Sequence, residues 1–429
     1  MHTIQEEVKQ LNGYNLHLVP NKKFKTINIV VKFKAPLERE TITKRALLPY
    51  LLQQGPNKYP SRKELQIALD SLYGAVLSID GGKKGNHHII SYRLEVANEK
   101  FIPNESNMVE DAFNLLNEVI FQPNVTNNAF KDATFKRETE TLRQKIKAVI
   151  DDKMKYANMR LIDEMCEDEA YQLHVHGYEE DLATLNPELI YEYYRTILQE
   201  DQVDVYVLGD FDLNDMERIV SSTMKRMKKE KPTSGEENAH TKKEESKEII
   251  DKQNIQQAKL HIGYRTNCRY QDKAYPALQV FNGILGGFPG SKLFVNVREK
   301  NSLAYYASSR LESHKGLLLV FSGIAPGDYE KARKIMEEQM EAMMKGDISK
   351  QELSETKELI VNQLLETLDN PQGIIEMLYQ QVIADVDLSP HQLIESIKKV
   401  SINEVKEVGN KIELDTVYLL TSEGGTANE

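Results

Sequence analysis

Cysteine is almost absent from this chain of 429 residues, with Cys166 and Cys268 the only two. They lie about a hundred residues apart, so they form neither a disulfide framework nor a paired-cysteine zinc site, and we expect two reduced thiols. Long apolar runs are also lacking, and no stretch reaches the roughly 18 apolar residues that a bilayer span requires. The first residues, Met1 to Glu7, lack the basic start and apolar run of a secretory signal. These absences predict a soluble cytoplasmic protein.

Positive charge is in deficit, because 55 Lys and Arg residues stand against 66 Asp and Glu residues and give a net charge of -11. A negative protein repels a phosphate backbone, and no stripe of basic and aromatic residues counters that repulsion. We therefore expect no nucleic-acid partner. Hydrophobic residues make up 40% of the chain and charged residues 28%, which is the balance of a globular protein and excludes a disordered one.

The length of the chain suits two domains of about 200 residues each. Residues 225–248 are charged, contain Ser, Thr and Gly, and carry few large apolar side chains, which predicts a linker. The alternative is a long surface loop within one domain. We predict an N-terminal domain at 1–228, a charged linker at 229–252 and a C-terminal domain at 253–429.

The order of predicted elements in the first half recurs in the second. Before the linker the pattern predicts a strand at 26–33, a helix after Ser61, two strands within 75–96, helices at 108–121, 129–167 and 187–198, and a strand at 203–208. After the linker it predicts a strand at 260–264, a helix at 274–285, strands at 304–311 and 316–323, and helices from 329 onward. Each half ends in a helix, a short loop and a strand, which we expect at the sheet edge. This repetition favours an α+β fold of two homologous domains, each a largely antiparallel sheet flanked by helices.

The motifs of a self-sufficient hydrolase are missing. The chain has no Walker-type phosphate loop, no Gly-x-Ser-x-Gly elbow and no His-Glu-x-x-His helix. His87 and His88 are neighbours in a strand and point to opposite faces, while His174 and His176 have no carboxylate or cysteine at ligand spacing. We expect these histidines to be exposed or hydrogen-bonded rather than bound to a metal.

The most informative segment is residues 283–306. It holds the Gly286-Gly287 loop, the Leu293-Phe294 pair and the run from Arg298 to Tyr305. It resembles the insulinase, pitrilysin and mitochondrial processing peptidase family, whose C-terminal domain has a Gly-Gly loop, a Leu-Phe pair and an Arg-Glu-Lys-x-Gly-Leu-Ala-Tyr run. Ser302 departs from that pattern by replacing the glycine.

Further matches extend the resemblance over nearly the whole chain, at Gly55, Tyr59-Pro60, 176–182 and 207–211. In active members of that family a helix carries His-x-x-Glu-His, whose histidines bind zinc and whose glutamate activates the metal-bound water. The resemblance places Ala46, Pro49 and Tyr50 at these three positions.

A shift of one residue would instead place Leu47, Tyr50 and Leu51 there, and neither alignment contains a histidine or a carboxylate. The family's other zinc-binding glutamate falls seven residues after the position of Glu138, at Lys145. A lysine ammonium repels a divalent cation, so we expect no zinc and no cofactor in this chain. The resemblance is thus to a degenerate member, similar to the non-catalytic subunit of bacterial two-chain processing peptidases.

Arg298 and Tyr305 match the family's substrate-side pair, in which the arginine engages the substrate backbone and the tyrosine hydroxyl lies near the carbonyl under attack. The structural alternative is Arg298 in a salt bridge and Tyr305 packed in a core. The resemblance implies a non-catalytic, substrate-binding subunit, inactive alone, whose partner is a related zinc-bearing chain that cuts peptides. Two alternatives stay open, a non-enzymatic scaffold and a peptide-holding homodimer.

Overall fold

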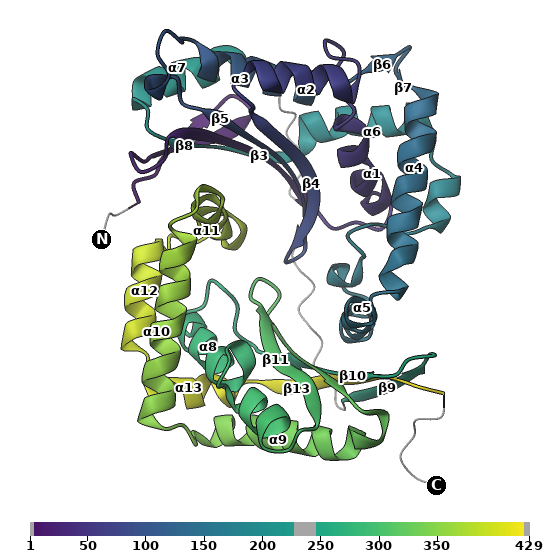
Figure 1. Cartoon of the computed structure of the whole chain (residues 1–429), viewed down its shortest axis with the longest axis vertical. Coiled ribbons are helices and arrows are strands. Elements are labelled where there is room, and N and C mark those ends of the chain that lie inside the picture. Colours follow the sequence, from purple (N-terminus) through teal and green to yellow (C-terminus); the bar gives the residue numbers. More distant parts are fainter. Residues whose placement is uncertain (1–3, 227–245, 424–429) are drawn as a thin grey trace. The chain divides into compact units, whose positions relative to one another are not determined.

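The computed structural model describes residues 4–226 and 246–423, which form two compact units (Figure 1). The first unit is drawn from Met1–Ala148, Leu173–Glu236 and Pro371–Ile375, and the second from Val149–Gln172, Glu237–Asn370 and Glu376–Glu429. The predicted domains, 1–228 and 253–429, differ from this division chiefly in the segment Val149–Gln172. Of the predicted linker, residues 229–245 lie outside the described residues, and Lys247–Lys252 form a strand.

The first unit is built on a six-stranded sheet with the order β1-β2-β8-β3-β5-β4. All neighbouring strands are antiparallel except β2 and β8. The strands are β1 (Glu7–Leu11), β2 (Tyr14–Pro20), β3 (Thr26–Pro36), β4 (Val76–Lys84), β5 (His87–Ala97) and β8 (Gln202–Gly209), with a small hairpin of β6 (Val125–Thr126) and β7 (Ala129–Phe130) apart from the sheet.

Helices cover one face of this sheet, and Figure 1 shows α2, α3 and α7 lying over it. The helices are α1 (Ile42–Leu52), α2 (Arg62–Ser71), α3 (Met108–Phe121), α4 (Asp132–Lys147), α6 (Pro187–Glu200) and α7 (Leu213–Thr223). Two begin where the sequence indicates: Ser61 accepts a hydrogen bond from the Glu64 amide, and Asn186 caps α6 with Pro187 at its first position. The apolar faces of the helices of this unit form one core with alternate residues of β3, such as Ile29 and Val31.

The second unit repeats this plan with the sheet order β11-β12-β10-β13-β9, in which only β13 and β9 are parallel. Its strands are β9 (Lys247–Lys252), β10 (Ala258–Arg265), β11 (Ala304–Glu312), β12 (Leu317–Ile324) and β13 (Glu413–Thr421). Its helices include α5 (Lys153–Met165), α8 (Tyr275–Asn282), α9 (Tyr329–Lys345), α10 (Lys350–Thr367), α12 (Pro390–Lys399) and α13 (Ile402–Gly409), while α11 (Pro371–Ala384) starts in the first unit.

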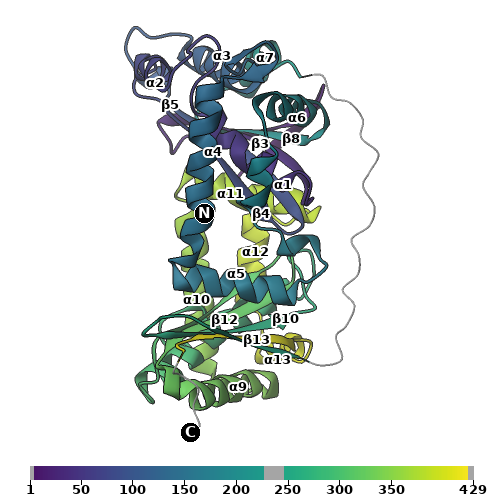
Figure 2. The ribbon, with the colours of Figure 1, turned by 90° about the vertical axis from the view of Figure 1, so that its right-hand side faces the viewer.

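The second sheet is covered on both faces (Figure 2). One face meets α8, α9 and α13 in the main core of the unit, and the other meets α5. Gly263 of β10 permits the close approach of α5, because a Cβ atom there would lie 2.0 Å from the sulfur of Met165. A helix encoded in the first half of the chain therefore belongs to the core of the second unit.

Two sequence predictions are wrong in detail. The long helix predicted at 129–167 is divided, because α4 ends at Lys147 and the Asp152 side chain caps α5 by accepting a hydrogen bond from the Lys155 amide. The strands that close each half, β8 and β13, are interior rather than edge strands. The α+β class and the antiparallel sheets flanked by helices are confirmed. No helix within the described residues combines the length and apolarity needed to cross a membrane.

Candidate functional site

The helix that would carry a zinc motif is α1, and its side chains mostly serve the core. Ala46 and Pro49 are buried, and Tyr50 is partly exposed and packs against the core of the first unit. In the shifted alignment, Leu47 and Leu51 are also buried core residues. Neither set offers a metal-binding atom beyond the Tyr50 hydroxyl.

Helix α4 packs against α1 and supplies the other half of this region. Glu138 is buried, and its carboxylate accepts a hydrogen bond of 2.7 Å from Arg137 Nε. Arg137 also donates to Gln54 Oε1 at 2.8 Å, which links α4 to the end of α1. Lys145 is exposed. The pKa of His176 is lowered mainly by the burial of the imidazole and then by the positive charge of Lys145. The positively charged Lys145 thus occupies the position on α4 where the resemblance expects a metal-binding glutamate.

A cavity of about 530 Å³ lies between these two helices. We call it the motif cavity, and it is lined by Tyr50, Gln53, Gln54, Arg62, Arg137, Glu138 and Thr141. It thus brings Tyr50, one predicted motif position, together with the carboxylate of Glu138, but the two arginines in its wall repel a divalent cation. Across residues 4–226 and 246–423, no group of three or more His, Cys, Asp or Glu side chains could hold a metal ion. The side chains present therefore do not fit a catalytic zinc.

Of the histidines singled out from the sequence, His88 takes a structural role. His88 is buried, and its Nδ1 accepts a hydrogen bond of 3.2 Å from Arg45 Nε. Burial lowers the pKa of His88 well below its usual value, and the Arg45 charge lowers it further. Arg45 is itself buried and pairs with Asp201 at 2.7 Å. This ion pair could not be predicted from the sequence, because Arg45 and Asp201 lie far apart in the chain.

Arg298 and Tyr305 flank a turn in the second unit. Arg298 lies near the end of a short π-helix, Phe294–Glu299, with its guanidinium over the Phe294 ring at 4.8 Å. It is exposed and makes no ion pair with any residue that the structure describes. Tyr305 is 75% exposed, and its hydroxyl has no hydrogen-bond partner among the described side chains. The alternative of a salt-bridged Arg298 and a core-packed Tyr305 is therefore wrong.

Tyr305 owes its exposure to a β-bulge. In the pairing of β11 with β12, Ala304 lies opposite Ile324 and Tyr306 lies opposite Gly323, so Tyr305 has no cross-strand partner. Strand β11 is also the edge of its sheet, so one side of its backbone has no neighbouring strand within the unit.

The turn before β11 is closed by backbone hydrogen bonds. The Ser302 amide donates to the Arg298 carbonyl and the Leu303 amide donates to the Val297 carbonyl, both at 3.0 Å. Ser302 has a φ of +53°, the left-handed conformation that a glycine would adopt without cost. The turn is thus formed with serine in the place where the resemblance has glycine.

Comparisons with known proteins agree with these observations. A family model described as "Peptidase M16 inactive domain" matches residues 184–360. The chain is 44% identical over 429 residues to "Probable inactive metalloprotease YmfF" of Bacillus subtilis (strain 168), covering 100% of both proteins. It is 25% identical over 256 residues to "Uncharacterized zinc protease YmxG" of the same strain, covering 57% of this chain and 59% of that protein.

A solved structure also resembles the chain over its full length. The crystal structure of a conserved protein from Enterococcus faecalis has a TM-score of 0.89 and 33% sequence identity, and the match covers 99% of this chain and 100% of that chain. The two-unit architecture is therefore shared with an experimentally determined protein.

Proposed function

This chain belongs to the M16 peptidase family as a homologue of inactive metalloproteases, and we propose that it is the non-catalytic, substrate-binding subunit of a two-chain zinc peptidase. The proposal has two parts. The chain holds no zinc of its own, and a related zinc-bearing chain supplies the metal that activates water for peptide hydrolysis. One relative of this chain is named as a zinc protease, which supports a partner of that class.

The observation that carries the proposal is the state of Arg298 and Tyr305. Both side chains are exposed and lack ion pairs or hydrogen bonds to described residues, although the ligand positions on α1 and α4 hold unsuitable residues. The Arg298 guanidinium, which lies over the Phe294 ring, and the exposed Tyr305 hydroxyl are both accessible to a group from outside the chain.

Strand β11 supports a peptide as the ligand. Its free edge can pair with an extended backbone by β-augmentation, which selects for peptides independently of sequence. In the proposed role, Arg298 holds the peptide backbone and the Tyr305 hydroxyl donates a hydrogen bond to the carbonyl oxygen under attack. The positive charge of Arg298 also suits the negative charge that develops on that oxygen.

Affinity purification of the tagged chain from its native cell tests the proposal. We expect a zinc-bearing M16 homologue to co-purify at a fixed stoichiometry, with zinc in that homologue alone. The complex should hydrolyse an unstructured peptide, and each isolated subunit should hydrolyse it at a background rate. The three samples must be matched in concentration and in free zinc.

Other outcomes would select the alternatives. A stable complex that lacks chelator-sensitive hydrolysis against a diverse peptide library would favour the scaffold. A native mass of twice the chain, without another protein, would favour the peptide-holding homodimer. Zinc at one per chain in the isolated protein would overturn the proposal outright.

A further inference from the structure

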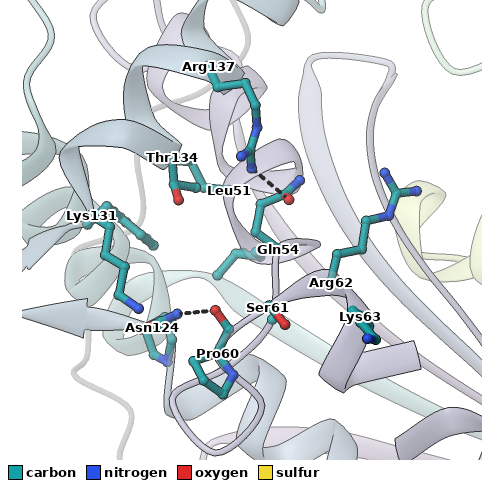
Figure 3. Close-up of a pocket in the computed structure, with 14 residues that line it drawn as sticks. Leu51, Gln54, Pro60, Ser61, Arg62, Lys63, Asn124, Lys131, Thr134 and Arg137 are labelled. Atoms are coloured by element: carbon teal, nitrogen blue, oxygen red, sulfur yellow. Dashed lines mark hydrogen bonds between the residues drawn. The ribbon is translucent and has the colours of Figure 1, made fainter. Parts of the chain in front are cut away.

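A second cavity, of about 310 Å³, lies in the first unit where α1 ends and where α2 and α4 begin (Figure 3). We call it the basic cavity. It is lined by Leu51, Leu52, Gln54, Gly55, Pro60, Ser61, Arg62, Lys63, Pro123, Asn124, Phe130, Lys131, Thr134 and Arg137. It shares Gln54, Arg62 and Arg137 with the motif cavity, so the two adjoin.

The charge of this lining is one-sided. Four cationic side chains contribute to it, Arg62, Lys63, Lys131 and Arg137, and no carboxylate does. This is unusual in a chain whose net charge is -11. Within the part of the chain that the structure describes, Arg62, Lys63 and Lys131 make no ion pair. Their charges are therefore not neutralised by the protein itself.

The carboxylates nearest in sequence are already engaged. Glu64 accepts a hydrogen bond from Ser61 Oγ at 2.7 Å, and Asp132 pairs with Lys136 at 2.7 Å. Glu138 is held by Arg137. None of the three lines the basic cavity, so an anion from solution would meet little competition there.

The backbone adds to the attraction for an anion. Ser61 and Lys131, both in the lining, are the residues that precede the first turns of α2 and α4. The Lys131 side chain makes no capping hydrogen bond, so it leaves the first amides of α4 to another acceptor. The Ser61 side chain already caps α2, so it is the N-terminus of α4 that adds its positive end to the cationic lining.

The rest of the lining combines the polar side chains of Gln54, Asn124 and Thr134 with an apolar part. Leu51, Leu52 and Phe130 are buried core residues that present part of their surface to the cavity, and Pro60 and Pro123 complete the wall. A free phosphate or acetate ion would leave much of this surface and volume unused. A ligand with an oxyanion head and a small apolar group would use both.

We propose that the basic cavity is a binding site for a small organic oxyanion, either a phosphate monoester or a carboxylate. The oxyanion binds the unpaired cations of the lining, and the apolar group contacts Leu51 and Phe130. This site is independent of Arg298 and Tyr305, and it needs no partner chain. The region where active relatives bind a metal cation thus borders, in this chain, a site for anions.

Isothermal titration calorimetry on the full-length chain tests this site with four probes at low ionic strength. These are phenyl phosphate, benzoate, inorganic phosphate and the neutral benzyl alcohol. We expect phenyl phosphate or benzoate to bind one per chain and more tightly than inorganic phosphate, and benzyl alcohol not to saturate. Binding should weaken as salt rises from 50 to 500 mM, a range chosen because charge attraction is screened over it.

Variants identify the cavity. Arg62→Gln combined with Lys131→Gln should weaken binding of the best probe at least tenfold, because two charge-assisted contacts are lost. A charge-matched control, Lys155→Gln with Lys345→Gln, removes two exposed lysines of the second unit and should change affinity less than twofold. Circular dichroism should show the same melting temperature for both pairs.

The relative affinities of phenyl phosphate and benzoate assign the head group, and tight binding of either supports the site. Three results would overturn it. In the first, no probe binds more tightly than benzyl alcohol. In the second, the variant with Arg62→Gln and Lys131→Gln keeps the wild-type affinity. In the third, the control variant loses as much affinity as that variant does.

Discussion

A divalent metal ion needs anionic or imidazole ligands, and the positions on α1 and α4 that the resemblance assigns to such ligands hold other residues. On α1, Ala46 and Pro49 are buried in the apolar core, where a charged side chain would be costly. On α4, Glu138 keeps a carboxylate, but Arg137 already occupies it. Lys145 adds a positive charge on the same helix. Because the unsuitable residues lie on both helices, we expect that changing the residues of α1 alone does not create a metal site.

We therefore predict that the triple variant Ala46→His, Pro49→Glu, Tyr50→His does not become a peptidase. The expected zinc content stays well below one per chain, and no chelator-sensitive hydrolysis appears, because Lys145 still repels the ion. Metal analysis and a fluorogenic peptide assay check both statements. A variant that adds Lys145→Glu to these three changes isolates the effect of the lysine charge. Hydrolysis by the triple variant would contradict this prediction, because it would show that Lys145 does not prevent zinc binding.

Arg298 and Tyr305 call for substitutions that spare the fold, and their exposure makes this possible. In the assembled two-chain enzyme, we predict that Tyr305→Phe lowers kcat by roughly tenfold to a thousandfold, the range for one lost transition-state hydrogen bond. Arg298→Ala should also raise KM, because the arginine holds the peptide before and during attack. Steady-state kinetics on the purified complex separates the two effects.

Two exposed residues provide controls for this experiment. Arg218→Ala removes an exposed arginine of α7, and Tyr73→Phe removes the hydroxyl of an exposed tyrosine, both in the first unit. Both should leave kcat and KM within twofold of the wild type. Wild-type rates in the Arg298 and Tyr305 variants, with assembly confirmed, would favour the scaffold.

At the scale of elements, the docking of α5 on the second sheet depends on a buried charge network. Arg265 of β10 pairs with Asp415 at 2.8 Å and with Glu169 at 2.8 Å, and it donates to the carbonyl of Met165 at the end of α5. Lys315 also pairs with Glu169 at 2.7 Å. Because Glu169 follows α5 in the chain, these bonds fix the helix at its C-terminal end.

We predict that Glu169→Gln destabilises the protein by about 2 kcal/mol at pH 7, because Arg265 and Lys315 are left buried with less compensation. Burial raises the pKa of Glu169, but Lys315 and Arg265 outweigh it and hold the pKa below the ordinary value of 4.5. The stability from this carboxylate is thus present above pH 4.5 and is lost as pH falls through the lower folded-state pKa.

Urea denaturation between pH 7 and pH 3 measures this effect. The difference between wild type and Glu169→Gln should shrink as pH falls below 4.5. Glu167→Gln, two residues away and mostly exposed, is the control and should differ little from wild type at every pH. A difference that does not depend on pH would contradict the proposed role of the charge.

Most elements could be predicted from the sequence because their determinants are local. β-Branched runs predict β3 and β8, and Ser61 and Asn186 mark the starts of helices. The position of β8 and β13 inside their sheets could not be predicted, because strand order depends on which distant segment pairs alongside. The basic cavity was also missed, since its cations come from two segments far apart in the chain, 62–63 and 131–137, and form no motif. The turn at Ser302 lies in a contiguous run, so it could be predicted as a candidate site from the sequence.

At the scale of the whole molecule, the chain exchanges segments between its two units. Residues 149–172, from the first half, complete the second unit, and residues 371–375, from the second half, belong to the first. In the second unit, α5 covers an apolar sheet face formed by Leu317, Leu319, Phe321, Tyr418 and Leu420. A division of the chain at the predicted linker would therefore separate this face from its cover.

We predict that a fragment of residues 246–429 exposes this face, binds a hydrophobic dye and aggregates, although it contains every strand of its sheet. Fusing residues 149–172 to its N-terminus through a flexible linker should restore the cover, suppress dye binding and give a cooperative thermal transition. The control is the same fusion with Leu161→Asp, which places a charge in the buried contact and should abolish the rescue. A stable, soluble 246–429 fragment that binds no dye would show that α5 is dispensable, and the boundaries predicted from the linker would then describe independent domains.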